Sequence, residues 1–175
     1  KEWSEVGDTG YINDVLYTVV DREMLTSMLQ NGSDVTKIAT TKITIMSNLF
    51  YNKTSFNQNI GNWDVSNVTS MYAMFWNASS FNQSIASDTF NGYWITTSVG
   101  DMNNMFNGAS QFNNGGFPDI QTWSAPNCIT FASMFQNATL FNQPLTNLVD
   151  TSTVISCTLT SMFQSATLFN QDIGG

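Results

Sequence analysis

The chain has 175 residues, no histidine, and thirteen Asp and Glu against five Lys and Arg, which gives a net charge of −8. All of the basic residues fall in the first third of the chain: Lys1, Arg22, Lys37, Lys42 and Lys53. This balance repels polyanions and argues against nucleic acid or an anionic membrane surface as a partner, while the 42% of hydrophobic residues is enough to form a folded core.

Residues 1–45 predict an N-terminal cap. A β-hairpin is expected over residues 11–20, with its turn at Asn13-Asp14. Asp21 suits the N-cap of a short helix over residues 22–30. The apolar residues of this helix fall on one face: Met24, Leu25, Met28 and Leu29. A helix with one apolar face is what shields the open end of a stacked core.

Residues 46–175 repeat one phrase five times: a Met-Phe or Leu-Phe pair, then a second Phe six residues after the first, followed by Asn-Gln or Asn-Asn. The first Phe of each copy is Phe50, Phe75, Phe106, Phe135 or Phe163, and the second is Phe56, Phe81, Phe112, Phe141 or Phe169. The first Phe advances by 25, 31, 29 and 28 positions between copies, so only the connections vary in length. This pattern is typical of a solenoid, and we expect equivalent phenylalanines to line up through a shared interior.

The second copy predicts the structure of one coil. Met71, Met74, Phe75 and Ala78 recur at i, i+3, i+4 and i+7, which predicts a short helical turn with one buried face. Residues 81–85 alternate apolar and polar types, which predicts a short strand. Stacked copies of this strand would pair as a parallel sheet. The sequence therefore predicts an α/β repeat of about five coils behind a hairpin-helix cap.

Two tryptophans recur at one place in the predicted coil. Trp63 lies four residues before Asn67, and Trp123 lies four residues before Asn127. We expect both rings to anchor the turn between one strand and the next helical turn.

The two cysteines, Cys128 and Cys157, lie seven and six residues before the first Phe of their repeats. Adjacent coils place such near-equivalent positions about 5 Å apart, within the range that a disulfide allows. Two interpretations stay open: a disulfide made in an oxidising compartment, or two buried thiols that pack as small hydrophobic groups. Two cysteines without histidine argue against a zinc site.

The segment from Phe56 to Met71, followed by Met74-Phe75, resembles the BspA-type leucine-rich-repeat region, also described as the DUF285 repeat of mycoplasma surface proteins. The lead-in over residues 7–22 is similar to the openings of such arrays in marine Bacteroidetes. The resemblance covers nearly the whole chain. It implies an LRR-like solenoid on secreted or surface-anchored proteins, associated with adhesion and protein binding.

One Asn in each copy predicts a row of stacked amides: Asn57, Asn82, Asn113, Asn142 and Asn170. Amides one coil apart can exchange hydrogen bonds and satisfy polar groups at the turns, so we interpret the row as a structural ladder. The alternative is an exposed amide row that contacts a glycan or a peptide.

Four aromatic residues are candidates for ligand binding. Tyr72 and Trp76 occupy positions that are polar or small in later copies, and Tyr93 and Trp94 lie in the inserted segment that follows. Aromatic residues at such positions indicate an exposed contact patch, or else they cover the insertion.

The sequence favours neither an enzyme nor a metal protein. Without histidine, serine-triad and histidine acid-base chemistry are absent, and no phosphate loop or metal-ligand cluster is present. The aspartates in the repeats do not recur at one fixed position, as calcium ligands would. We expect no cofactor and no metal.

The function expected from these features is a non-enzymatic binding or adhesion module, secreted or at the cell surface, with a protein or glycan ligand. Partners in the same longer chain and like subunits are also expected, because the last copy breaks off within the phrase and leaves an uncapped end. Two alternatives are a structural stalk or assembly subunit, cellular or viral, and a carbohydrate-binding module. Without a run of eighteen apolar residues, direct membrane insertion is not expected.

Overall fold

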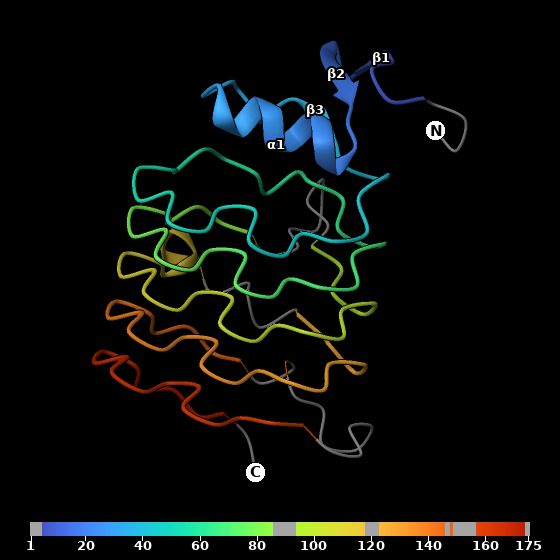
Figure 1. Cartoon of the computed structure of the whole chain (residues 1–175). Helices are drawn as coiled ribbons and strands as arrows, with labels where there is room; N and C mark the ends of the chain where they lie inside the picture. Colours follow the sequence, from blue (N-terminus) through green and yellow to red (C-terminus); the bar gives the residue numbers. More distant parts are fainter. Residues whose placement is uncertain (1–4, 86–93, 118–122, 146–147, 149–156, 174–175) are drawn as a thin grey trace.

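The computed structural model describes residues 5–85, 94–117, 123–145, 148 and 157–173. The repeats form coils that stack on one another, and a small sheet and one helix lie at the N-terminal end of the stack (Figure 1). The regular elements are β1 (Thr9–Ile12), β2 (Val15–Val19), α1 (Arg22–Gln30), β3 (Ile38–Ala39) and the 3-10 turn η1 (Asn114–Gly116).

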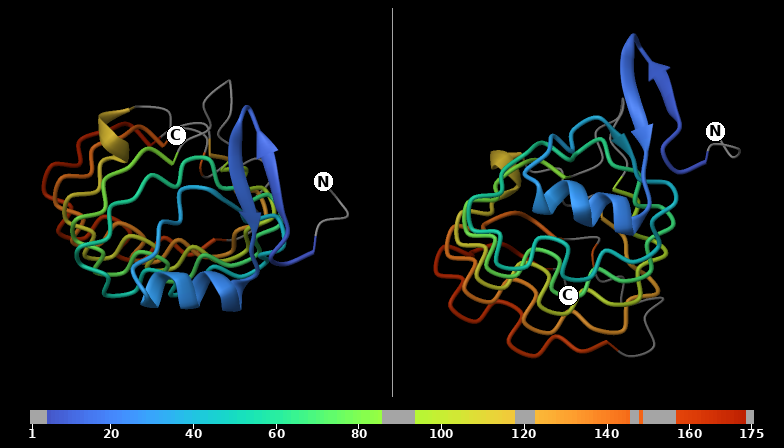
Figure 2. Two further views of the ribbon diagram at one scale, coloured as in Figure 1. Left: turned by 90° about the horizontal axis from the view of Figure 1, so that it is seen from above. Right: turned by 45° about the horizontal axis from the view of Figure 1, so that its top comes forward.

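The N-terminal hairpin and helix are confirmed. β1 and β2 pair antiparallel, with Ile12 opposite Val15, and both turn residues between them have positive φ, as a tight two-residue hairpin turn requires. The side chain of Asp21 accepts a hydrogen bond from the Met24 N–H at the start of α1. The sequence did not reveal β3, which pairs parallel to β2. The hairpin projects beyond the stack, whereas α1 lies across its end (Figure 2).

Successive coils are joined through one segment of each repeat, which we call the ladder segment. The five ladder segments are residues 46–53, 71–78, 102–109, 131–138 and 159–166. In the first four, every second N–H donates to a carbonyl of the next coil, as Phe50 does to Met74 at 2.8 Å. Most of the N–H groups in between donate three residues back, as Tyr51 does to Asn48 at 3.2 Å. Those of Tyr72, Asn103 and Ala132 donate to a side-chain oxygen two residues back. Half of the donors therefore close local turns and half hold the coils together.

The predicted helical turn is wrong. Each ladder segment contains two residues of positive φ, four positions apart, whereas an α-helix needs negative φ throughout. These residues are Asn48 and Asn52, Ala73 and Asn77, Asn104 and Gly108, Ser133 and Asn137, and Ser161 and Ser165. Asn and Gly tolerate this conformation best, so the sequence converts a helix-like apolar spacing into a run of turns.

The predicted strand over residues 81–85 is also wrong. The N–H of Asn82, which would pair with backbone in a parallel sheet, donates instead to the side-chain oxygen of Asn57 at 2.9 Å. Regular parallel pairing within the described repeats is limited to isolated bridges: Ile45 with Ser70, Ser70 with Asp101, and Thr130 with Thr158. The repeats thus stack with little regular secondary structure.

The core is a double column of phenylalanine rings, as predicted from the repeated phrase. The first rings of successive copies lie 4.9, 5.1, 5.5 and 5.8 Å apart between centroids. The second rings lie 5.8 to 5.9 Å apart, and the two rings of one copy stack at 3.9 to 4.2 Å. Each coil therefore rests on its neighbour through aromatic contact at the spacing that offset stacking favours.

Candidate binding surface

The ladder segments present two rows of side chains on the flank of the stack. The first row is Ser47, Tyr72, Asn103, Ala132 and Thr160, and the second is Tyr51, Trp76, Asn107, Gln136 and Gln164. Within a row, the backbone carbonyls of the last four residues accept the coil-to-coil hydrogen bonds, so the members lie one coil apart. All of them are at least partly exposed except Asn107, which is buried.

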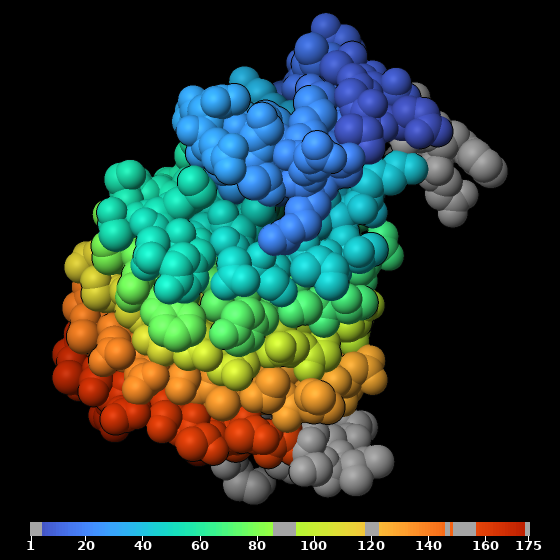
Figure 3. Space-filling model, viewed as in Figure 1, coloured from blue at the N-terminus to red at the C-terminus, as the bar shows by residue number. Residues whose placement is uncertain are grey.

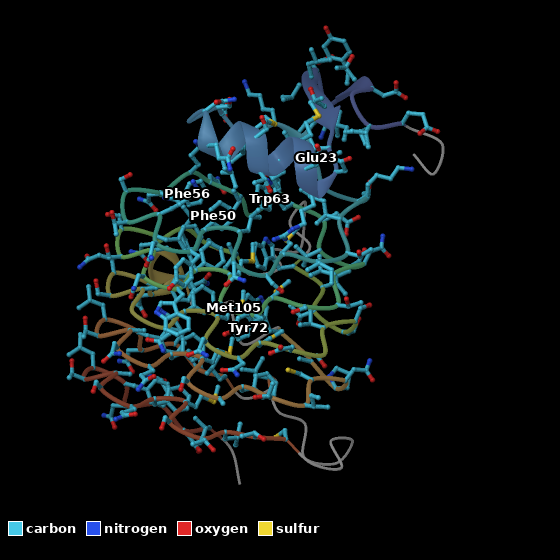
Figure 4. The ribbon with its side chains drawn as sticks, in the orientation of Figure 1. Glu23, Phe50, Phe56, Trp63, Tyr72 and Met105 are labelled. Atoms are coloured by element: carbon cyan, nitrogen blue, oxygen red, sulfur yellow. The ribbon has the colours of Figure 1, made fainter. Side chains whose placement is uncertain are left out.

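The upper end of these rows is aromatic. Tyr51 is 45% exposed, Tyr72 is 37% exposed and Trp76 is half-buried. The rings of Tyr51 and Trp76 meet edge to face, with centroids 5.7 Å apart and planes at 61°. We call these three residues the aromatic patch. Figure 3 shows the first two coils, which carry it, in cyan to green below the blue N-terminal cap, and Figure 4 labels Tyr72.

The lower end of the second row consists of amide side chains that hydrogen-bond to one another. Asn107 Nδ2 donates to Gln136 Oε1 at 2.9 Å, and Gln136 Nε2 donates to Gln164 Oε1 at 2.7 Å. Each amide has two N–H donors and an oxygen with two lone pairs, so Gln136 and Gln164 keep hydrogen-bonding capacity toward the surface. The flank therefore combines apolar rings with ordered polar groups.

Of the four aromatic residues predicted to bind ligand, the structure places Tyr72 and Trp76 on one surface. Tyr93 lies outside the described residues. The prediction for Trp94 is wrong, because its side chain is 1% exposed. Its Nε1 donates to the Ile60 carbonyl at 3.1 Å and its ring stacks on Trp123 at 5.9 Å, so both its polar and its apolar parts are satisfied inside the core.

Trp94 belongs to a set of three equivalent tryptophans. Trp63 Nε1 donates to the Val35 carbonyl at 3.0 Å, and Trp123 Nε1 donates to the Ile85 carbonyl at 3.2 Å. Each bond reaches back to the preceding coil, as that of Trp94 does. This is the anchoring role expected of Trp63 and Trp123, extended to a third coil.

Tyr51 was missed in the sequence, although a signal was present. The residue directly after the first Phe of each copy lies in the second row, and there Tyr51 in the first copy is the counterpart of Trp76 in the second. Comparing all five copies at this one position would have paired the two rings.

The row of asparagines hydrogen-bonds from coil to coil. Asn57 Oδ1 accepts from the N–H of Asn82, and the same bond recurs from Asn113 to Asn82, from Asn142 to Asn113, and from Asn170 to Asn142, at 2.8 to 2.9 Å. Three of these oxygens also accept from a Gln side chain at 3.0 Å: those of Asn57, Asn113 and Asn142. With these oxygens engaged between coils, the geometry supports the structural interpretation of the row over ligand contact.

The two cysteines are free thiols. Cys128 is buried, and its Sγ–H donates to the Thr130 carbonyl at 3.3 Å. Burial raises the pKa of the Cys128 thiol to about 11, although backbone hydrogen bonds of Thr130 and Met102 act in the opposite direction. Cys157 is half-buried against the core. Of the two interpretations left open by the sequence, this structure therefore contains the pair of packed thiols.

Metal-binding clusters and membrane spans were sought in the part of the chain that the structure describes. No three side chains of His, Cys, Asp or Glu converge there as ligands for a metal ion. None of the helices in this part is both long and apolar enough to span a bilayer.

Comparison with known proteins gives one match. A family model described as "Mycoplasma protein of unknown function, DUF285" matches twice, over residues 21–116 and 88–175. No curated protein and no solved structure is similar enough to this chain to count as a match.

Proposed function

The chain belongs to the DUF285 family, whose proteins are described as mycoplasma proteins of unknown function, and from this premise we propose that it is a non-enzymatic binding or adhesion module. The stack would be an LRR-like solenoid displayed on a secreted or cell-surface protein. Its flank would contact a protein or a glycan. The observation that supports this proposal is the aromatic patch, three partly exposed rings on a scaffold whose own core is already filled.

The scaffold favours binding because it holds the patch in place before a ligand arrives. The backbone of each of the first four ladder segments is bonded to the next coil at every second residue, and Tyr51 packs against Trp76. Side chains that are ordered in advance lose little entropy on association, so more of the contact energy appears as affinity. Aromatic residues are also the commonest energetic anchors of protein interfaces.

The charge distribution narrows the class of ligand. Residues 54–175 contain six Asp and no Lys or Arg, so the stack repels anions. The ligand that fits is neutral or cationic.

A carbohydrate-binding module is the second candidate, and the amides below the patch favour it. Sugar rings present apolar faces and hydroxyl groups together, and the flank offers aromatic rings two coils from Gln136, whose amide has donor and acceptor capacity left. A structural stalk or assembly subunit, by contrast, would need only the stacking and no ligand on the flank.

The test is binding of the purified chain to an array of neutral, amino and acidic oligosaccharides, and to a panel of immobilised extracellular glycoproteins. Trp76→Ala and Tyr51→Ala are expected to weaken binding to any retained ligand by about tenfold or more, with unchanged melting temperature. Gln164→Ala, in the same row but remote from the rings, is the matched control. If a ligand still binds to both aromatic variants, the aromatic patch is not the binding site. If the chain binds neither the oligosaccharides nor the glycoproteins, the structural stalk is favoured.

A further inference from the structure

Two exposed amide side chains lie directly beside the aromatic patch. Asn52 follows Tyr51 and Asn77 follows Trp76 in the first two ladder segments, and both asparagines are exposed. Asn77 Nδ2 donates to Asn52 Oδ1 at 3.0 Å, so the two side chains form a pair across the same two coils that carry the rings. We call them the asparagine pair. The pair is therefore held in place next to the patch before any ligand arrives.

The row to which this pair belongs is interrupted in the next coil. Its members, all of positive φ, are Asn52, Asn77, Gly108, Asn137 and Ser165. Gly108 has no side-chain amide that could donate to Asn77 Oδ1, and a Cβ at Gly108 would overlap that oxygen. The glycine therefore ends the series of amide bonds below Asn77 and at the same time makes room for the Asn77 side chain.

The interruption leaves one donor group and one acceptor of the asparagine pair available. Among the residues that the structure describes, Asn52 Nδ2 has no acceptor and Asn77 Oδ1 has no donor. A side-chain amide offers two N–H donors and an oxygen with two lone pairs, so both groups can bind a ligand. A donor beside an acceptor is complementary to a secondary amide, whose carbonyl accepts a hydrogen bond and whose N–H donates one.

The charge next to the pair restricts the ligand further. Lys53 is the only charged residue of the first two ladder segments, and its Nζ donates to the Leu29 carbonyl at 3.3 Å. A cationic ligand at the pair would be repelled by this ammonium group, and an anionic ligand would be repelled by the acidic stack. Of the neutral and cationic ligands that the whole stack allows, the asparagine pair therefore favours the neutral ones.

We propose that the aromatic patch and the asparagine pair together recognise a neutral acetamido sugar, an inference that rests on the proposed binding function. In the complex, Asn52 Nδ2 donates to the acetamido carbonyl and Asn77 Oδ1 accepts from the acetamido N–H. The rings of the patch contact the acetyl methyl group and the apolar face of the sugar. A peptide backbone offers the same amide but no hydroxyl groups, whereas the spare amide capacity of Gln136 on this flank suits the hydroxyls of a sugar chain.

The test is isothermal titration calorimetry of the full chain with two neutral tetrasaccharides of the same linkage, chitotetraose and cellotetraose. The two differ in one group of each sugar ring, which is acetamido in chitotetraose and hydroxyl in cellotetraose. We expect chitotetraose to bind more tightly by about tenfold or more, because a hydroxyl group replaces neither the acetamido carbonyl nor its methyl group and leaves the asparagine pair incompletely satisfied.

Asn52→Asp tests the role of the pair with little change in shape. The substitution removes the free N–H donors and keeps the oxygen that accepts from Asn77, so we expect the preference for chitotetraose to disappear while the melting temperature stays the same. Asn59→Asp is the matched control, with the same change of charge at an exposed asparagine outside the ladder segments. Its carboxylate still accepts from the Gly61 N–H, as Asn59 Oδ1 does at 3.0 Å, and the preference is expected to remain.

Four outcomes would overturn the inference. Equal binding of the two sugars, lost for both in Trp76→Ala, would contradict the acetamido assignment and leave the proposed function intact. A preference that is unchanged in Asn52→Asp would exclude the asparagine pair as its cause. Competition by a neutral glycine-serine peptide as effective as chitotetraose would identify a peptide as the ligand. If neither sugar binds, the inference is wrong, and the proposed function fails with it only if the chain also binds nothing on the oligosaccharide array and the glycoprotein panel.

Discussion

Replacing Phe106 by Ala tests whether the double phenylalanine column holds the coils together. Phe106 is fully buried and contacts four rings, with centroids at 5.1 Å (Phe75), 4.0 Å (Phe112), 5.5 Å (Phe135) and 6.3 Å (Trp123). Truncating a buried Phe to Ala costs about 3–5 kcal/mol, and the loss of stacked partners on three sides puts Phe106 at the upper end of that range. A cost of about 4–5 kcal/mol is a large part of the stability of a typical domain.

The assay is urea unfolding followed by tryptophan fluorescence, with Phe163→Ala as the matched control. Phe163 of the fifth copy is half-buried and contacts only Phe135 at 5.8 Å and Phe169 at 3.9 Å among the described rings. Because less of its surface leaves water on folding, its truncation is expected to cost about 1–2 kcal/mol. Equal losses in the two variants, or a loss below about 1 kcal/mol for Phe106→Ala, would refute the column as the source of stability.

Three further predictions concern polar groups. Arg22→Ala leaves the Ile45 and Ser47 carbonyls without their donors and is expected to lower the free energy of unfolding by about 1–3 kcal/mol in urea, whereas Lys37→Ala should change little. Asn113→Ala removes the acceptor for Asn142 and Gln143, so exchange of the Asn142 N–H should accelerate, while Asn113→Asp, which keeps the oxygen, should preserve its protection. Because burial raises the pKa of Cys128 to about 11, the unfolded chain loses the thiol proton first, and the free energy of unfolding should fall as pH rises from about 9 to about 11. This part of the fall should disappear in Cys128→Ala, and its persistence would contradict the assignment.

The parts of the fold that could be predicted are those set by local chemistry or by repetition. The two phenylalanines of each copy are always six residues apart, although the connections between copies differ in length. This constant spacing predicts a shared column of rings whatever the backbone conformation of each coil. The hairpin and α1 were predicted for a similar reason, since turn residues, an N-cap and one apolar face lie within a short window. β3 has only two residues and pairs with a strand about twenty positions away, so no local sequence pattern predicts it.

The helical turn was predicted wrongly because two backbones share one apolar spacing. Met71, Met74, Phe75 and Ala78 face the core in a run of turns as they would in a helix. What decides between the two is φ at Ala73 and Asn77, and alanine gives no warning of a left-handed conformation. The asparagines at Asn48 and Asn52 were the stronger signal, because Asn tolerates positive φ.

The candidate site was only partly predicted, although the sequence contains a signal for Trp94. Trp94 lies twelve residues before Phe106, as Trp63 lies before Phe75 and Trp123 before Phe135, so this spacing identifies Trp94 as the equivalent of the two anchoring tryptophans and not as a surface residue. Tyr72 and Trp76 lie inside the constant phrase, where register is kept, and there a comparison of copies identifies outward positions correctly.

The division between columns and rows explains how such a chain could change its ligand without changing its fold. Most coil-to-coil bonding uses backbone groups, the phenylalanines and the asparagine ladder, which do not depend on the side chain at the positions of Tyr72 or Trp76. Side chains at the Trp76 position add only contacts with one another. Those two positions hold polar or small residues in later copies whose backbone is the same. Substitution there is therefore expected to cost less folding free energy than substitution in the columns, and selection for a ligand can act more freely on such positions. Under the proposed function, the side chains of the two rows select the ligand, and the phenylalanine columns take no part in that selection.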